Sequence, residues 1–455
     1  MSLRVDTVAG VPGVYRQPAE AAAGFPRLRT DVCGFVGVAG PNRLGEAVRL
    51  DDWRSYEEVY LRDAKGRAIA PPAGARLRDT VRAYFANGGA RCWVVNVAEA
   101  IDESQKLTLL DAMLGWNAKT GLETLLEKRE VAIVALPELE AWVAATLEER
   151  FDAPILDEGQ FQCCPRVHGV GAITTTSEAL VTPLYQPAEV LAAQRAFIER
   201  IGRDKWRVFG LVTVPRGLSP AQVAAWRVGL TTNLADADCA ALYWPWVEAT
   251  DRPGQVPTAQ PPLGFVAGIF ARRDLKRGPH VAPANEYLYG VSAVERAVTD
   301  EEHGVLNAAA VNVIRPFPNR GLELWGARTL AYGRDRSDIG ELGYVNVRRC
   351  LTAIERTCDA EGQRVVFEPN QPMTRFVLAQ VISSYLMTAW KGGAFKGANP
   401  EESFFVRCDS TNNPREVVEA GRLVCEIGVA IAAPAEFIVF RLGRAEGVVE
   451  LQEVG

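Results

Sequence analysis

The feature that most limits how this chain can fold is a repeated order of amphipathic helical segment and short, continuous apolar run. A first run, CGFVGVAG, stands at residues 33–40, helix-then-run pairs follow over 81–97, 121–139 and 192–215, and a further run, ALYWPWV, stands at 241–247. Apolar runs without polar alternation are typical of strands buried on both faces, and intervening helices allow parallel neighbours. The pattern predicts an α/β fold with a largely parallel, doubly covered sheet.

The composition predicts a globular chain of two to three domains. The chain has 455 residues, of which 48% are hydrophobic and 23% charged, as in ordinary soluble proteins. A formal net charge of -6 provides no basic field for a phosphate backbone, so we expect no nucleic-acid partner. The first residues lack the apolar core of a secretory signal, and no apolar run approaches the roughly 20 residues that span a bilayer, so we expect no membrane partner.

Residues that could carry catalysis or hold a cofactor are few. The nine cysteines include no C-x-x-C pair, and the three histidines (His168, His280 and His303) lack a metal-ligand spacing. No Walker A loop, G-x-S-x-G or H-E-x-x-H motif occurs. We therefore predict no catalytic, cofactor or metal site and synthesis in a reducing cytoplasm, with a hydrolase-like α/β enzyme as an alternative.

The two ends of the chain differ from the middle. Residues 1–20 carry Pro12 and Pro18, which disfavour helix and predict an extended arm. The last residues predict two strands, 435–444 and 446–454, joined by a turn around Gly443 to Gly447. An isolated hairpin or single strand is marginal in water, so each needs a sheet to join, in its own subunit or in a neighbour's.

Between the ends, three further segments are predicted. Residues 141–187 break the helix-then-run pattern and form an insertion of unassigned fold. Helices are expected near 344–359 and 373–391, the second with a wide apolar stripe that leaves it half or more buried, and a strand is expected at RVVFEP, 364–369. The composition of this part favours packing over chemistry.

Ordered motifs in the last third identify a resemblance. VVFEPN (365–370), FFVRCDSTNNP (404–414) and EIGVAIAAPAEFIVFRLGR (426–444) occur in an order and spacing that resemble the sheath protein of contractile phage tails, tailocins and related contractile injection systems. The segments 277–291 and 304–330 resemble the same family, as do VPGVYRQ (11–17) and 81–97 near the start. Only residues 141–187 match nothing in the family.

The resemblance implies a fold and a domain plan. It implies an N-terminal strand-exchange arm over 1–20, a subtilisin-like α/β domain over 21–335 with a variable insertion near 141–187, and an α+β C-terminal sheath domain over 336–455 ending in a hairpin arm. It also implies a structural virion component without enzymatic activity that polymerises as a six-fold helical mesh and contracts. A sheath-like capping or initiating subunit shares most of these motifs and is a second alternative.

The partners follow from the same resemblance. They are further copies of this chain or paralogous sheath subunits, an inner tube protein, and baseplate and terminator or cap proteins, with assembly in the cytoplasm before the particle is released. The subunit-linking arms would use the apolar residues Val11, Val14, Tyr15, Phe437, Val439, Phe440, Val449 and Leu451. Candidates to face the tube are Arg348, Arg349, Lys391 and Lys396, each of which could instead be a solvated helix residue.

Overall fold

The computed structural model describes residues 28–116, 119–140, 142–144, 181–231, 236–250, 256–333, 340–436, 439–445 and 448–454. The chain divides into two compact units. The main unit comprises Thr30–Arg349 with Ala433–Gly455, and the small unit comprises Cys350–Ala432 with Met1–Arg29. The sequence-based boundaries at residues 20 and 335 stay predictions.

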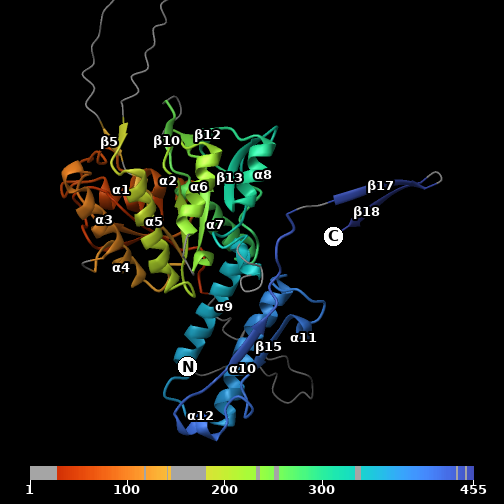
Figure 1. Ribbon diagram of the computed structural model, residues 1–455. Helices are drawn as coiled ribbons and strands as arrows, with labels where there is room; N and C mark the ends of the chain where they lie inside the picture. The colour runs from red at the N-terminus through yellow and green to blue at the C-terminus, as the bar shows by residue number, and fades with distance from the viewer. Residues whose placement is uncertain are drawn as a thin grey trace, which may run out of the picture. The chain divides into compact units, whose positions relative to one another are not determined.

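A nine-stranded sheet forms the centre of the main unit, in the order β11-β14-β13-β8-β7-β4-β1-β3-β2 (Figure 1). Six neighbouring strands run parallel, from β13 to β3, whereas β14 and the two edge strands β11 and β2 are antiparallel to their neighbours. The strands are β1 (Cys33–Gly37), β2 (Ala47–Leu50), β3 (Cys92–Asn96), β4 (Ile133–Ala135), β7 (Phe209–Thr213), β8 (Ala240–Trp244), β11 (Glu286–Tyr287), β13 (Val311–Phe317) and β14 (Gly321–Trp325). The predicted, largely parallel α/β sheet is confirmed.

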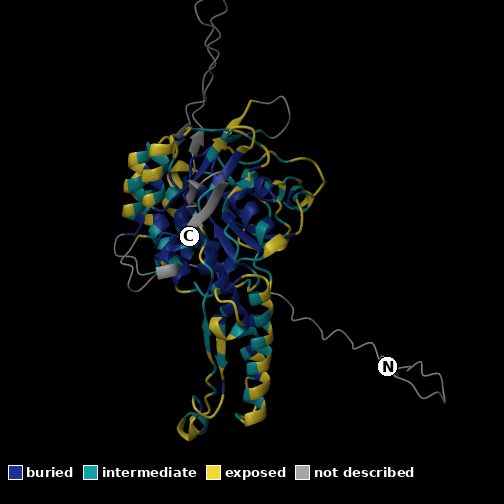
Figure 2. Ribbon diagram, turned by 90° about the vertical axis from the view of Figure 1, so that its right-hand side faces the viewer, coloured by how far each residue is buried: buried dark blue, intermediate teal, exposed yellow. Residues whose placement is uncertain are grey.

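Helices cover both faces of this sheet because its strands alternate their side chains between two apolar clusters. On β1, Val36 belongs to one cluster, which also contains residues of α3 (Lys106–Leu114), α4 (Gly121–Leu126), α5 (Pro187–Gly202), α6 (Pro220–Thr231) and α8 (Asp300–Ala308). Phe35 belongs to the other, with residues of α1 (Trp53–Tyr60), α2 (Leu77–Ala86) and α7 (Leu263–Arg277). In Figure 2 the sheet is accordingly buried while the outer helix faces are exposed.

Three short sheets complete the main unit. β9 (Val247–Ala249) pairs antiparallel with β10 (Thr258–Gln260) and β12 (Val291–Val294). β5 (Trp142–Ala144) pairs with β6 (Val181–Pro183), so the two ends of the predicted insertion are joined as antiparallel strands; residues 145–180 lie outside the described part. The predicted closing hairpin is confirmed as β17 (Val439–Ala445) and β18 (Val448–Val454), with Leu442 opposite Leu451.

The small unit holds most of α9 (Val345–Arg364), then α10 (Pro372–Lys391), α11 (Pro400–Ser403), β15 (Phe404–Arg407), α12 (Arg415–Glu419) and β16 (Glu426–Val429). The two predicted helices are confirmed. The strand predicted at 364–369 is wrong: α9 continues to Arg364, and Phe367 takes a left-handed φ of 72°. The N–H groups of Val365 and Glu368 donate to carbonyls three residues earlier, so local turn bonds replace a strand partner.

The apolar stripe of α10 is also narrower than predicted. Leu378, Ile382 and Leu386 are buried, whereas the neighbouring row begins with Val377, which is 48% exposed. The spacing of the apolar residues predicted that both rows are buried. In the small unit, one buried row is enough to hold α10 in place.

Candidate assembly edge in the small unit

The carboxyl ends of the parallel strands are where ligands bind in many open α/β sheets, but the polar side chains there bond to the protein itself. Glu138 follows β4, and its Oε1 accepts N–H groups of Arg76 and Leu77 at 2.8 Å each and of Val38 at 3.4 Å. Burial raises the pKa of Glu138 to about 7. These contacts cap the start of α2, a structural role.

Glu140 forms a second buried contact nearby. Its Oε1 accepts from Nε2 of Gln194 at 2.6 Å, and Oε1 of Gln194 accepts from the Trp226 indole at 2.9 Å. Burial raises the pKa of Glu140 to about 8. The network holds α5 and α6 against the sheet, and no nucleophile takes part in these bonds.

The histidines considered in the sequence do not assemble a hydrolytic site within the described residues. His303 lies on α8 with Nδ1 at 3.3 Å from the Arg315 guanidinium, and burial lowers its pKa. The carbonyl of His280 accepts from the Asn346 amide at 2.8 Å, and His168 lies outside the described residues. The described part contains no group of three or more His, Cys, Asp or Glu side chains placed to hold a metal ion.

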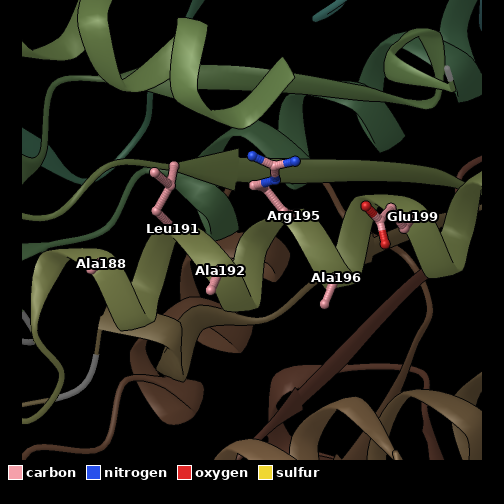
Figure 3. A pocket seen from close by; sticks show the side chains of 6 residues that line it. All are labelled: Ala188, Leu191, Ala192, Arg195, Ala196 and Glu199. Atoms are coloured by element: carbon pink, nitrogen blue, oxygen red, sulfur yellow. The ribbon is translucent and has the colours of Figure 1, made fainter. Parts of the chain in front are cut away.

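A surface hollow of about 380 Å³ lies on α5 (Figure 3). All of its lining residues belong to that one helix, and only Arg195 and Glu199 among them are charged. The hollow exists because three of the lining residues, Ala188, Ala192 and Ala196, are small side chains spaced four apart on one helix face. This arrangement does not bring reactive groups together.

Within the described residues, none of the helices combines the length and apolarity needed to cross a bilayer.

The small unit instead presents an unpaired strand edge. β15 and β16 form a sheet of two antiparallel strands, with Phe404 opposite Val429 and Arg407 opposite Glu426. Just beyond β16, Ala430 N–H donates to Ser403 O at 2.9 Å. Because backbone groups alternate sides along a strand, residues 426, 428 and 430 point their N–H and C=O toward β15, and Ile427 and Val429 point theirs to the opposite edge.

No other strand of the described residues pairs with that edge of β16. Phe395 pairs with Ile431 as a single bridge, and the bonds Lys396 N to Ala430 O and Ala432 N to Ala394 O place this contact on the β15 side. A two-stranded sheet is marginal by itself, and an open edge is a template for a strand from elsewhere. We call residues 426–429 of β16 the assembly edge.

Two motifs noted in the sequence build the support of this edge. Nδ2 and Oδ1 of Asn413 bond to the C=O and N–H of Val424, each at 2.8 Å, which closes the loop that joins the two strands. The amide of Asn370, from VVFEPN, donates to Arg422 O at 2.7 Å. The Phe405 ring covers Gly428, where a Cβ would lie 2.1 Å from it. Sequence reasoning singled out the motifs but missed the roles of Asn370 and Asn413.

Large apolar side chains are exposed around this sheet. Between Cys350 and Ala432 the exposed large apolar residues are Val366, Phe367, Met373, Phe376, Val377, Phe405 and Val424. The most exposed of them is Phe367, at 101% exposure. Such a concentration of exposed apolar residues in one small unit is typical of a surface that other chains cover.

The candidate arm residues are placed only in part. Val11, Val14, Tyr15 and Phe437 lie outside the described residues, whereas Val439 and Phe440 lie on β17 and Val449 and Leu451 on β18. Their role in linking subunits stays a prediction. At the root of this hairpin, Glu436 forms an ion pair with Arg328, whose Nε donates at 2.9 Å. Glu323, which stands five residues before Arg328, pairs with Arg320.

The tube-facing candidates fall into two kinds. Lys391 and Lys396 are exposed in the small unit. Arg348 and Arg349 are 3% and 4% exposed, and they pair within the main unit with Asp238 at 3.5 Å and Asp274 at 2.7 Å. Their burial favours a role inside the fold, because a guanidinium held in this way has little surface to offer another protein.

The open strand edge and the exposed apolar side chains of the small unit indicate a surface that another chain covers. The phage tail sheath protein central domain matches residues 178–330, and the phage tail sheath C-terminal domain matches residues 340–443, together more than half of the chain. The chain belongs to the phage tail sheath family.

Relatives from phages are consistent with this membership. The tail sheath protein of Vibrio phage KVP40 is 25% identical over 245 residues, covering 50% of this chain and 34% of that protein. The tail sheath protein of Burkholderia phage BcepMu is 24% identical over 273 residues, covering 58% of this chain and 54% of that protein. The matches therefore span about a third to a half of these relatives' length.

A solved structure resembles the chain over nearly its whole length. A chain of the anti-feeding prophage helical sheath in the contracted state superposes with a TM-score of 0.64 at 26% identity, covering 96% of this chain and 100% of that one. The large mixed sheet with its helices is therefore a sheath-like fold.

Proposed function

We propose that this chain is the structural subunit of a contractile sheath, which polymerises as a six-fold helical mesh around an inner tube and contracts to drive the tube through a target envelope. The observation that carries the proposal is the open assembly edge, located in the C-terminal region that the family model matches. The similarity to a contracted helical sheath over 96% of the chain supports the same function.

The mesh would be held by strand exchange. The arm at residues 1–20 and the hairpin β17–β18 would add to the β15–β16 sheet of neighbouring subunits, with Ile427 and Val429 supplying free backbone donors and acceptors. Backbone pairing links chains with little dependence on large side-chain patches, so the links can persist while the subunits rotate. The exposed apolar side chains of the small unit would then be covered by the added strands.

The main unit would act as the rigid body of contraction. In this proposal the subtilisin-like domain covers 21–335 and supplies most of the main unit, and the sheath domain covers 336–455, including the closing hairpin. Its two apolar clusters and buried ion pairs resist deformation, so contraction would repack interfaces between subunits. The energy would be stored in a metastable extended lattice.

The partners of the proposal are those of a sheath. Copies of this chain would be the neighbouring subunits, and an inner tube would fill the lumen. A baseplate would stand at one end of the polymer and a terminator or cap protein at the other. Lys391 and Lys396, being exposed in the small unit, are better tube-facing candidates than Arg348 and Arg349. Assembly would precede release of the particle from the cell.

A proline on the assembly edge tests the strand exchange. Val429→Pro removes an N–H that points away from β15, so it should cost no bond of the β15–β16 sheet while blocking strand addition. Val429→Thr keeps both the N–H and the branched side chain and is the matched control. We expect tubes from wild type and the threonine variant, and a folded monomer from the proline variant, by electron microscopy and circular dichroism.

Deletion of residues 1–17 tests the donor side of the same contact. It should abolish tube-like assemblies and leave a folded monomer. Unaltered tubes from both the deletion and the proline variant would refute strand exchange. Closed rings that never elongate, even with a tube protein supplied, would favour the capping or initiating subunit.

A further inference from the structure

Two cysteines stand opposite each other where the β15–β16 sheet ends. The register pairs Val406 with Ile427 and Arg407 with Glu426, so the next positions on the two strands are Cys408 and Cys425. The bond from Ala430 to Ser403 makes 405 and 428, and then 407 and 426, the hydrogen-bonded pairs. Cys408 and Cys425 therefore occupy a non-hydrogen-bonded position, where Cα atoms are about 4.5 Å apart and side chains lie closest.

The two thiols are in contact and both are reduced. A hydrogen bond joins the side chains of Cys408 and Cys425. The expected separation of their Cα atoms lies in the range of about 4.4–6.8 Å that a disulfide requires. The register of the two strands therefore allows a disulfide between these residues.

A cavity gives a small reagent access to one of these thiols. A hollow of about 690 Å³ is lined by residues of α9, α10 and the loops around β16, among them Cys358 and Cys425. Cys425 is partly exposed, whereas Cys408 is 7% exposed. A reagent in the cavity would meet Cys425 first, and Cys408 stands opposite Cys425 at the end of the neighbouring strand.

We propose that Cys408 and Cys425 form a disulfide when the chain meets a low-molecular-weight disulfide, which staples the two strands that carry the assembly edge. The Cys425 thiolate attacks one sulfur of the reagent R–S–S–R, forming Cys425–S–S–R and releasing RS⁻. The Cys408 thiolate then attacks the Cys425 sulfur and releases the second RS⁻. Two protein thiols lose two electrons and two protons, and the reagent is reduced to two thiols.

The surroundings of the pair set the rate of this reaction. Burial raises the pKa of Cys425 to about 12, and it raises the pKa of Cys408 as well, against the opposing effects of the Cys425 hydrogen bond and Arg375. The attacking species is the thiolate. Oxidation should therefore be slow at neutral pH. Its rate should rise about tenfold for each further pH unit, as long as the pH is below the pKa values of both thiols.

The bond would close the loop between the strands. Asn413 already ties this loop to Val424, and a disulfide would add a covalent link beside that contact. The unfolded chain would lose more freedom than the folded one, because the two strands are already paired in the native state. A sheet that presents an unpaired edge would thereby be kept together before and after a neighbour's strand is added.

A second pair of cysteines provides an internal control. Cys33 and Cys92 are directly opposite on the parallel strands β1 and β3, but both are 0% exposed. The native fold denies a reagent access to them. They should stay reduced under conditions that oxidise Cys408 and Cys425, which separates oxidation of the folded chain from oxidation of unfolded material.

The test uses the full chain and oxidised glutathione at about pH 8.5, where the thiolate fraction is raised. After incubation, the chain is unfolded in denaturant so that buried thiols can also react, free thiols are alkylated, and the chain is cut with trypsin. Trypsin separates Cys358, Cys408 and Cys425 because Arg364 and Arg407 lie between the first two and Arg415 and Arg422 lie between the last two. We expect a linked peptide carrying Cys408 and Cys425, lighter by two hydrogen atoms than its reduced parts, restored by dithiothreitol, and alkylated Cys33 and Cys92.

Other products would overturn the proposal. These are alkylation of both Cys408 and Cys425, separate glutathione adducts on each, or a link between Cys358 and Cys425. Cys358→Ser should leave the linked peptide unchanged. Cys408→Ser should instead trap the glutathione adduct on Cys425, a result that a fold-disrupting substitution would not give, since unfolded chains would also modify Cys33 and Cys92.

Discussion

The buried pair of Arg349 and Asp274 offers a sharp test of whether Arg349 acts inside the fold or on a partner. The guanidinium donates to both carboxylate oxygens, at 2.8 and 2.7 Å, and to Thr30 O at 2.8 Å. Both side chains are nearly excluded from water, at 4% and 2% exposure. The guanidinium also lies 4.8 Å from the centre of the Phe270 ring.

Arg349→Met would leave a buried carboxylate without its partner, and Asp274→Leu would leave a buried guanidinium. Each change should reduce the free energy of unfolding by about 3–5 kcal/mol, the usual cost of breaking a buried ion pair. The double variant replaces the pair by apolar groups and should come within about 2 kcal/mol of wild type, since only the Thr30 carbonyl is left unsatisfied. The coupling energy should therefore be large.

Urea unfolding followed by tryptophan fluorescence measures these energies. Nine of the ten tryptophans lie in Thr30–Arg349 and only Trp390 lies in the small unit, so the signal reports the main unit. Arg349→Lys serves as a control that keeps the charge but not the two-bond geometry. If the two single changes were additive, or if Arg349→Met unfolded like wild type but failed only to bind a tube, the assignment of Arg349 to the interior would be wrong.

Three further predictions concern the main unit. Burial raises the pKa of Glu140 from 4.5 to about 8, so the folded chain keeps a proton that the unfolded chain releases, and the free energy of unfolding should fall as pH rises between these values. Glu140→Gln should flatten that fall, by on the order of 5 kcal/mol at most, in urea unfolding at a series of pH values. Gly264→Ala should destabilise the chain by about 1–3 kcal/mol, because the new Cβ would lie 2.2 Å from Thr80 O, whereas Gly304→Ala, in the open on α8, should be neutral or stabilising by up to about 1 kcal/mol. Glu436→Ala should make the chain more sensitive to proteolysis near residue 436 without lowering the melting temperature greatly, because it breaks the ion pair at the root of the closing hairpin; an unchanged cleavage rate would argue against this role.

Most of the parallel strands of the central sheet could be predicted because they are buried on both faces and consist mainly of apolar residues. Continuous apolar runs such as those of β4 and β7 are typical of strands in the middle of a covered sheet, and the helices between them favour parallel order. The strands β2, β11, β13 and β14 were not predicted. β2 and β11 are short, partly exposed edge strands with a weak pattern, and polar residues such as Asn312, Arg315 and Glu323 interrupt the apolar residues of β13 and β14.

The parts that could not be predicted depend on contacts between distant residues. The sequence predicts Arg348 and Arg349 on the surface of a helix. They are buried because they pair with Asp238 and Asp274, which are distant in the sequence. A strand was wrongly predicted at Val365 and Phe367 because both residues have high strand propensity. Backbone hydrogen bonds of the turn that follows α9 determine the actual conformation. The bond from Asn370 to Arg422 likewise joins segments that no local pattern connects.

The most direct test of strand exchange in a sheath is electron cryomicroscopy of the polymer formed by the full chain, with a tube protein supplied if tubes do not form without it. We predict hollow six-fold tubes in which a strand from a neighbouring subunit pairs with Ile427 and Val429 on the assembly edge. Monomers that never polymerise, or tubes in which that edge of β16 has no strand partner, would contradict the proposed function.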